Sequence, residues 1–393
     1  MRQLLSHHLQ VQEGQVCVAG MKDKRAITWQ RCSAPAAAAA LPTLLRWPSD
    51  PQHSYVVLHA SSHARGVVYP APIQLGQLRG NYFEITVRDV RGAGSAAAAP
   101  ARALLERRLR WVAAHGFINY FGQQRFSESV RSLQDHTGLL LVRGRYVAAV
   151  RSLYRGCPAL YDEHFPDRMD ARHVPGSARD AQAITQALKQ ACRQYFQDGA
   201  RQQGEGPLTR DDVAHESPRW QRICERAITA GVPYALRSMW VHAAQSLYFN
   251  VTASCLAARL QEGHAAEGEE AEEEATLLLQ LQLPLGGYRM APRPLTATGA
   301  AAARLEGLVG AASTQALAAL ALSREALYEQ RRVAGVPLSG GCRHFLVRPT
   351  EAHLGLSAAP LSTGLDLQAR FFLPSSSYAT VLLREIFGND VWW

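Results

Sequence analysis

Lysine is rare in this sequence. It occurs only as Lys22, Lys24 and Lys189, and every other positive side chain among the 42 lysine and arginine residues is an arginine. Because an ammonium and a guanidinium differ in hydration and in hydrogen-bond geometry, the two neighbouring lysines mark a place where geometry matters as well as charge.

Close cysteine pairs and long apolar runs are also missing. The seven cysteines are an odd number without close pairs, which argues against a zinc site and against a disulfide framework. The longest uncharged alanine-rich stretch, between Glu306 and Arg324, is too short and too weakly apolar to cross a bilayer, and the N-terminus has no cationic start followed by an apolar core. We therefore expect no membrane segment and an intracellular protein of the nucleus or cytoplasm, without excluding an organelle.

Positive charge is in excess. The formal net charge is +9 and the isoelectric point is about 9.4, which favours a polyanionic partner such as nucleic acid. A chain of 393 residues is long enough for one large or two medium domains.

One carboxylate lies among cations in residues 16–30, VCVAGMKDKRAITWQ. The apolar run 16–19 predicts a buried strand, Gly20 turns the chain into a charged tip, and residues 26–29 predict a second strand. Asp23 is flanked there by Lys22, Lys24 and Arg25, which favour its ionised form. Taken alone, such a triplet is most often a solvated turn; the alternative is a carboxylate nucleophile.

Two further stretches carry aromatic and amide side chains. Residues 74–90 alternate, with Phe83, Ile85 and Val87 predicted on one face of a strand. Residues 116–126, GFINYFGQQRF, follow a predicted helix over 102–115 and interleave aromatic residues with one arginine. Such a loop is suited to stacking on an unpaired base and to gripping a phosphate, although a packed loop is the commoner outcome.

Five stretches in the same order resemble the TruD family of pseudouridine synthases, in particular its eukaryotic branch. They are AGMKDKRAITWQ (19–30), LGQLRGNYFEITVR (75–88), GFINYFGQQRF (116–126), RSMWVHAAQSLYFN (237–250) and FFLPSSSYATVLLREI (371–386). The family usually has a glycine where this chain has Ser127, and members carry an N-terminal strand region that we expect to be missing here.

The resemblance implies a fold and a division of the chain. We expect an α+β fold, in which a mixed or antiparallel sheet flanked by helices is interrupted by a helix-rich insertion domain. The catalytic core would comprise 1–136 and 341–393 and the insertion 137–340, with a helix over 236–260 that could also pack on the core. The pattern further predicts one helix over 299–331, strands over 342–349 and 365–373, and a helix over 378–387.

The resemblance also implies an activity. We expect an isomerase that converts uridine to pseudouridine in tRNA or in other RNAs, acting as a monomer without metal or cofactor. Asp23 would be the catalytic nucleophile, and RNA would be bound by Lys22, Lys24, Asn81, Phe83, Asn119, Arg125 and Phe126. Within this set Asn81 braces the catalytic loop and Phe83 stacks on the target base.

Other functions stay open at this point. The same fold could hold RNA without modifying it. A glycosidase is less favoured because it needs a second carboxylate in a comparable motif. His59 and His63 have a metal-binding spacing, but their serine and glycine neighbours favour a loop.

Overall fold

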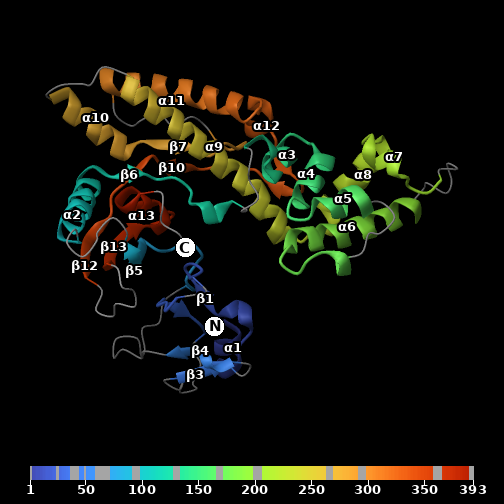
Figure 1. The fold of residues 1–393 in the computed structure, drawn as a ribbon, viewed down its shortest axis with the longest axis horizontal. Helices are drawn as coiled ribbons and strands as arrows, with labels where there is room; N and C mark the ends of the chain where they lie inside the picture. Colours follow the sequence, from blue (N-terminus) through green and yellow to red (C-terminus); the bar gives the residue numbers. More distant parts are fainter. Residues whose placement is uncertain are drawn as a thin grey trace. The chain divides into compact units, whose positions relative to one another are not determined.

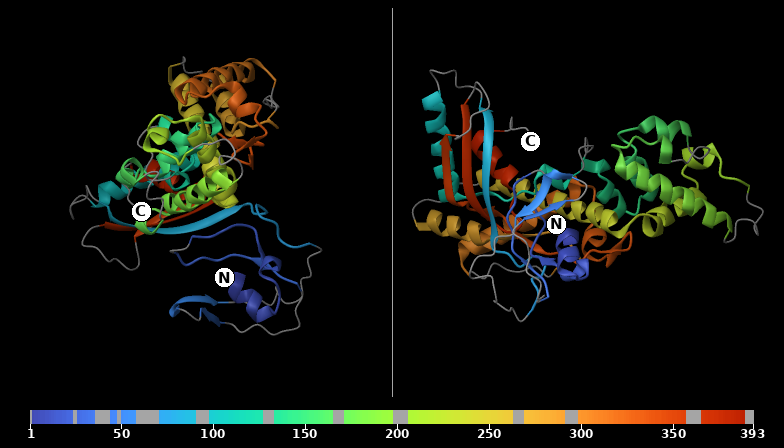
Figure 2. Two further views of the ribbon diagram at one scale, coloured as in Figure 1. Left: turned by 90° about the vertical axis from the view of Figure 1, so that its right-hand side faces the viewer. Right: turned by 90° about the horizontal axis from the view of Figure 1, so that it is seen from below.

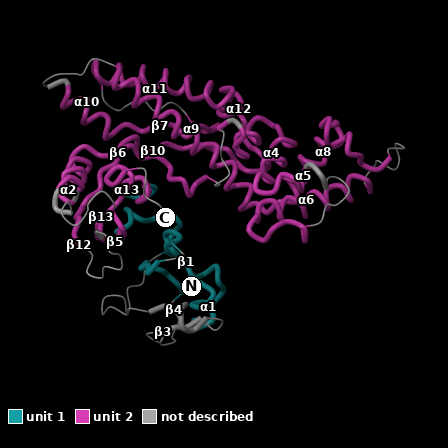
Figure 3. Tube along the Cα trace, in the orientation of Figure 1, with its two compact units in different colours: residues 1–82, 374–376 teal, residues 83–373, 377–393 magenta. Residues whose placement is uncertain are grey.

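The computed structural model describes residues 2–23, 26–35, 44–47, 50–57, 71–90, 98–126, 133–164, 171–197, 206–262, 269–290, 298–356 and 365–388. Lys24, His59, His63 and Ser127 lie outside these ranges. The chain divides into two compact units, shown in different colours in Figure 3. Unit 1 holds residues 1–82 and 374–376, and unit 2 holds residues 83–373 and 377–393.

Unit 1 is built from short elements (Figure 1). They are α1 (Arg2–Leu9), the 3-10 turn η1 (Glu13–Gln15), β1 (Cys17–Val18), β2 (Cys32–Ser33), β3 (Leu44–Trp47) and β4 (Asp50–Val57). Leu4, Leu5 and Val16 form a small core between α1 and β1. The strand β1 pairs antiparallel with β2, and β3 pairs antiparallel with β4.

A three-stranded sheet in the order β12-β13-β5 carries the predicted alternating strand (Figure 2). Its strands are β5 (Gly80–Val90), β12 (Thr350–Leu356) and β13 (Leu365–Pro374). Phe83, Ile85 and Val87 of β5 pack against the buried residues of β13, as the alternation predicts, whereas Glu84 and Arg88 are exposed. Two helices, α2 (Ala98–His115) and α13 (Ala379–Phe387), complete this core.

The helical part of unit 2 is organised around the 29-residue helix α9 (Tyr234–Glu262). It packs along α11 (Ala300–Ala319) and against α3 (Thr137–Val142) (Figure 1). The other elements are α4 (Tyr146–Leu153), α5 (Pro158–His164), α6 (Arg179–Tyr195), α7 (Arg210–Ala214), α8 (Pro218–Arg226), α10 (Glu269–Gln280), α12 (Arg324–Tyr328), the 3-10 turns η2 (Gln123–Arg125), η3 (Leu133–Asp135) and η4 (Ala171–His173), and the π-helical turn η6 (Ala227–Gly231). None of the described helices is both long and apolar enough to cross a membrane.

Short antiparallel strand pairs join distant parts of unit 2. They are β6 (Phe117–Ile118) with β11 (Leu346–Val347), β7 (Gln282–Pro284) with β10 (Cys342–His344), and β8 (Arg332–Val333) with β9 (Val336–Pro337). The pairing of β6 with β11 brings residue 118 next to residue 346. It therefore fixes where the loop that begins at Asn119 lies relative to the end of the chain.

Three predicted elements are corrected by the structure. The strand predicted over 26–29 does not form: these residues are exposed and irregular, and β1 pairs instead with β2 further along the chain. The helix predicted over 299–331 is two helices, α11 and α12, because Leu320 and Leu322 both turn into the core and Ser323 caps the second helix. The strand predicted over 342–349 is divided into β10 and β11, which pair with different partners. The predicted domain boundaries at 136/137 and 340/341 stay a prediction; the largest hydrophobic cluster draws its buried residues from Leu139 to Leu338.

Candidate functional site

Asp23 lies in unit 1 just after the strand β1. Its side chain is exposed, and no described residue forms a hydrogen bond or an ion pair with it. The strands before and after it are held in place, because Gly76 N donates to Ala19 O at 2.7 Å, just after β1, and Ile73 N donates to Ser33 Oγ of β2 at 2.9 Å. An exposed carboxylate close to an anchored strand is thus available to an incoming molecule.

Lys22 does not pair with the neighbouring carboxylate. Its Nζ donates a hydrogen bond to Oδ1 of Asn81, at the start of β5. The strand start is itself held by a hydrogen bond from Ser375 N to Arg79 O at 2.9 Å. Of the predicted residues of unit 1, the structure therefore brings Lys22 and Asn81 together, and this contact ties the residue before Asp23 to β5.

Phe83 belongs to unit 2 and follows Asn81 on the same strand. The side chain is half-buried, and its ring lies 5.6 Å from that of Phe371, with 33° between the planes. Phe371 is buried in the sheet core. Phe83 thus has one side in the core, as its periodicity predicts, and its remaining surface is open to solvent.

The loop from Asn119 to Phe126 is anchored by three elements of unit 2. Asn119 N donates to Phe345 O at 2.8 Å, beside the β6–β11 pair. The side chain of Asn250 on α9 clasps the Phe121 backbone, since its Oδ1 accepts from Phe121 N at 2.8 Å and its Nδ2 donates to Phe121 O at 3.0 Å. The third support is α13, where Arg384 Nη2 donates to Gln123 Oε1 at 2.9 Å.

The predicted RNA-binding residues of this loop differ in their surroundings. Asn119 is 3% exposed, and its side-chain oxygen accepts a hydrogen bond from Arg343, so it supports the loop from inside. Arg125 is half-buried and donates from Nε to Ser246 Oγ at 3.2 Å. Phe126 packs on the helical core and meets His136 edge-on, with 6.1 Å between the ring centroids.

Arg343 was not predicted from the sequence, and it is the most buried charge near this loop. It is 6% exposed and lies over the Phe121 ring, 4.0 Å from the centroid, with the rings of Phe249 and Tyr378 at 5.4 and 5.7 Å. Burial, together with the nearby charge of Arg125, lowers the pKa of Arg343 to about 10. Its only signal in the sequence is an arginine inside a short strand pattern, which does not mark a site.

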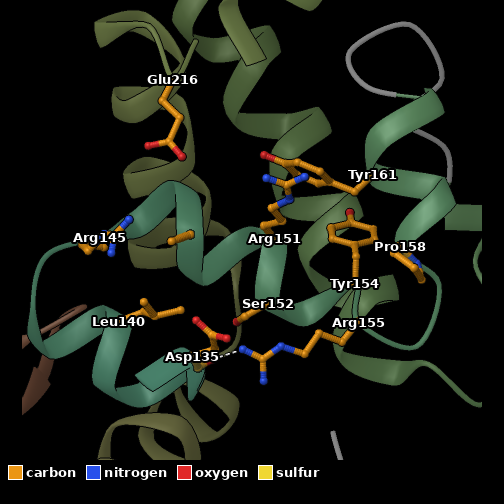
Figure 4. Close-up of a pocket in the computed structure, with 11 residues that line it drawn as sticks. Asp135, Leu140, Arg145, Arg151, Ser152, Tyr154, Arg155, Pro158, Tyr161 and Glu216 are labelled. Carbon is orange, nitrogen blue, oxygen red and sulfur yellow. Dashed lines mark hydrogen bonds between the residues drawn. The ribbon is translucent and has the colours of Figure 1, made fainter. Parts of the chain in front are cut away.

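A cavity of about 430 Å³ lies elsewhere, in the helical part of unit 2 (Figure 4). None of the residues predicted for RNA binding or catalysis lines it. Its wall is of mixed charge: the Arg155 side chain donates to the carbonyl of Asp135, and Arg151 lies over the Tyr161 ring at 5.8 Å. Among the described residues, no group of three or more His, Cys, Asp or Glu side chains is placed to hold a metal ion.

Comparison with known proteins identifies the family. The model of the family "tRNA pseudouridine synthase D (TruD)" matches residues 1–280, which is more than half of the chain. The chain belongs to the TruD family. The family predicted from the sequence is thereby confirmed.

Individual TruD relatives extend the match along the whole chain. A Caenorhabditis elegans protein named "Putative pseudouridine synthase" is 29% identical over 415 residues, covering 99% of this chain and 64% of the relative. The pseudouridylate synthase PUS7L of Mus musculus is 26% identical over 438 residues, covering 99% of this chain and 55% of the relative. The chain therefore spans just over half to nearly two thirds of the length of these two relatives.

A solved structure of a TruD protein supports the fold. The crystal structure of the "Putative tRNA pseudouridine synthase D (TruD)" from Methanosarcina mazei matches with a TM-score of 0.53 and 22% identity. The match covers 98% of this chain and 84% of that chain. With the mixture of helices and antiparallel strands described above, it confirms the predicted α+β fold.

Proposed function

We propose that this protein is an RNA pseudouridine synthase that acts on tRNA and uses Asp23 as its nucleophile. Family membership supports the reaction class, and the relatives carry the same activity in their names. The observation that carries the assignment to Asp23 is its exposed carboxylate, which has no partner among the described residues and directly follows Lys22, the residue bonded to Asn81 at the start of β5. A carboxylate engaged in a structural ion pair would be poorly suited to this task.

The reaction needs a carboxylate and a place for the extruded base. The N-glycosidic bond of a uridine breaks, the uracil turns, and a new bond forms between carbon 5 of the base and the sugar. The hydrogen on carbon 5 leaves as a proton and N1 gains a proton, so that the product is an isomer of uridine. A carboxylate nucleophile toward the sugar, or toward an intermediate derived from it, accounts for the chemistry, provided that the uridine is extruded from its stack. In this proposal Phe83, whose outer surface is open, receives the extruded uracil by stacking.

Lys22 and Asn81 position the nucleophile in this mechanism. The ammonium of Lys22 is directed to the amide oxygen of Asn81. Because Lys22 precedes Asp23 directly, this hydrogen bond limits the conformations open to the nucleophile before substrate binds.

The substrate class follows from charge and from the family. A net charge of +9 suits a polyanion, and the matching family is named for tRNA. We therefore assign tRNA as the first substrate to test, with other structured RNAs as the next.

The test is an Asp23→Asn variant compared with the unchanged chain. We expect the variant to form no pseudouridine, measured by carbodiimide mapping of tRNA incubated with each protein, while its affinity for RNA stays within a few fold. Glu13→Gln is the matched control, because it neutralises another exposed carboxylate of unit 1 and should leave activity intact. Activity retained by Asp23→Asn would refute the mechanism. RNA binding without pseudouridine formation by the unchanged chain would favour the alternative of a binding protein on the same fold.

A further inference from the structure

The guanidinium of Arg343 is a buried charge without a carboxylate. Among the described residues, no Asp or Glu forms an ion pair with Arg343, and the charge of a second cation, Arg125, acts on it. A buried charge is costly unless it is paired or well hydrogen-bonded. The aromatic faces and carbonyl groups around Arg343 offset part of this cost, and they leave its net charge uncompensated.

Only one edge of this guanidinium is occupied. Nε donates to Asn119 O at 2.8 Å, and Nη2 donates to Asn119 Oδ1 at 2.8 Å and to Tyr120 O at 3.3 Å. No hydrogen bond from Nη1 to a described residue accompanies them. Arg343 thus holds the start of the loop with two nitrogens and keeps a third one available.

A second cation, Arg125, belongs to the loop that Arg343 holds. The Arg125 side chain donates from Nε to Ser246 Oγ, and within the described part of the chain its terminal nitrogens form no hydrogen bond, so they are available as well. Its charge is felt by Arg343 and lowers the pKa of that residue. Both arginines are fixed to the loop of residues 119–126, Arg343 through Asn119 and Tyr120 and Arg125 as one of its residues. Like charges on one loop repel each other, and a shared anion reduces the repulsion.

The loop backbone at Gly122 is closely packed. A Cβ added at Gly122 would lie 2.7 Å from Gln124 Oε1, 2.8 Å from Tyr378 Cδ1 and 2.9 Å from Thr380 Oγ1. The loop therefore sits directly against the beginning of α13, where Thr380 Oγ1 donates to Gln124 Oε1 at 3.1 Å. Such close packing keeps the two cations in place before any ligand arrives.

We propose that Arg343 and Arg125 together bind one phosphate group of the RNA, with Arg343 donating from Nη1 while its other nitrogens hold the loop. This inference rests on the proposed function for the identity of the ligand. A planar guanidinium suits a phosphate because it presents parallel N–H groups to two oxygens. The site adds Arg343, which the sequence did not reveal, to the residues predicted to contact RNA.

The experiment measures how RNA affinity depends on salt. The full chain carrying Asp23→Asn serves as the parent, so that the reaction does not consume the RNA. Arg343→Gln, Arg125→Gln and the double variant are compared with Arg107→Gln, which removes a charge from the exposed face of α2. The dissociation constant for tRNA is measured at several salt concentrations, and the melting temperature of each variant is recorded.

A shared phosphate makes a specific prediction. Each contacted phosphate contributes roughly 0.7 to 0.9 to the slope of log affinity against log salt. We expect the slope of the double variant to fall by about one such increment, and its affinity to fall on the order of tenfold. The loss of slope in the double variant should be close to that in each single variant, because both arginines contact the same phosphate. Arg107→Gln should keep the parent's slope. An unchanged slope in the double variant overturns the proposal, as does a loss of about two increments, which would indicate two separate phosphates.

A second measurement covers the case in which Arg343→Gln does not fold. Inorganic phosphate should raise the melting temperature of the parent more than that of Arg125→Gln at equal ionic strength, and Arg107→Gln should respond like the parent. Equal responses of all three proteins would overturn the shared site. Pseudouridine formation by the unchanged chain is assayed separately, so a failure of this inference can be told from a failure of the proposed function.

Discussion

His136 makes the stability of the helical part of unit 2 depend on pH. It is the N-cap of α3, where its Nδ1 accepts a hydrogen bond from Gly138 N at 3.1 Å, and it is 3% exposed. Burial, and to a lesser extent the charge of Arg155, lower the pKa of His136 to about 4. Protonation would place a hydrogen on the nitrogen that accepts the cap bond, so the folded state favours the neutral ring.

The size of the effect follows from the two pKa values. An unfolded histidine titrates near 6.5, so lowering it to about 4 in the folded state corresponds to a difference of about 3 kcal/mol at 1.36 kcal/mol for each pKa unit. The stabilisation by neutral His136 is complete above pH 6.5. It is lost as the pH falls from about 6.5 to about 4, because the unfolded chain takes up a proton that the folded chain refuses. By pH 5 the loss amounts to about 2 kcal/mol.

The assay is urea unfolding of the chain and of a His136→Asn variant between pH 8 and pH 5, followed by circular dichroism. Asparagine can cap a helix and does not titrate in this range. The variant loses the contact with Phe126 and should therefore be less stable than the unchanged chain at pH 8. The difference in their free energies of unfolding should shrink by about 2 kcal/mol at pH 5. Curves that stay parallel between pH 8 and pH 5 would refute the assignment of a buried neutral histidine.

Two further predictions concern packing. Gly138→Ala should destabilise the chain by about 1 to 3 kcal/mol or more, because the new Cβ would fall on the carbonyl oxygen of Trp240. The control is Gly307→Ala on α11, where a Cβ would meet nothing within 4 Å, and it should stabilise the chain by about 0.4 to 1 kcal/mol. Equal changes of the two variants in urea unfolding would contradict this steric account. Phe83→Leu keeps an apolar side chain at a half-buried position, so it should cost clearly less stability than the about 3 to 5 kcal/mol of emptying a buried Phe site. It should nevertheless lower kcat/KM on tRNA by the equivalent of about 1 to 3 kcal/mol if the ring stacks on the uracil. An unchanged kcat/KM would return Phe83 to a core role.

Local patterns in the sequence were enough to predict several elements. The two-residue period of β5 placed Phe83 and Val87 on the core face because one side of the sheet is buried. The apolar line over 236–260 predicted α9, which extends from Tyr234 to Glu262. In both cases a single element carries a periodic pattern long enough to be read without knowledge of its neighbours.

Other features depend on contacts that a local pattern does not contain. The break between α11 and α12 has no glycine or proline to announce it, and it exists because Leu320 and Leu322 are both drawn into the core. Arg343 meets Asn119 across 224 residues of sequence. Strand pairs such as β6 with β11 decide whether an arginine is exposed or buried between aromatic rings. The sequence of such short antiparallel strands specifies their pairing only weakly.

The same supports explain how a loop can serve as a binding surface. Residues 119–126 contain only a single 3-10 turn, η2, and a loop of this kind would lose conformational freedom on binding RNA. Here that cost is met largely during folding, since α9 clasps Phe121, Arg343 holds Asn119 and α13 holds Gln123. A cation held by such a scaffold loses little further freedom when it contacts a phosphate. The buried charge of Arg343, which has no carboxylate partner among the described residues, is then consistent with a site arranged in advance for an anion, because a purely structural position would be filled at lower cost by an uncharged side chain.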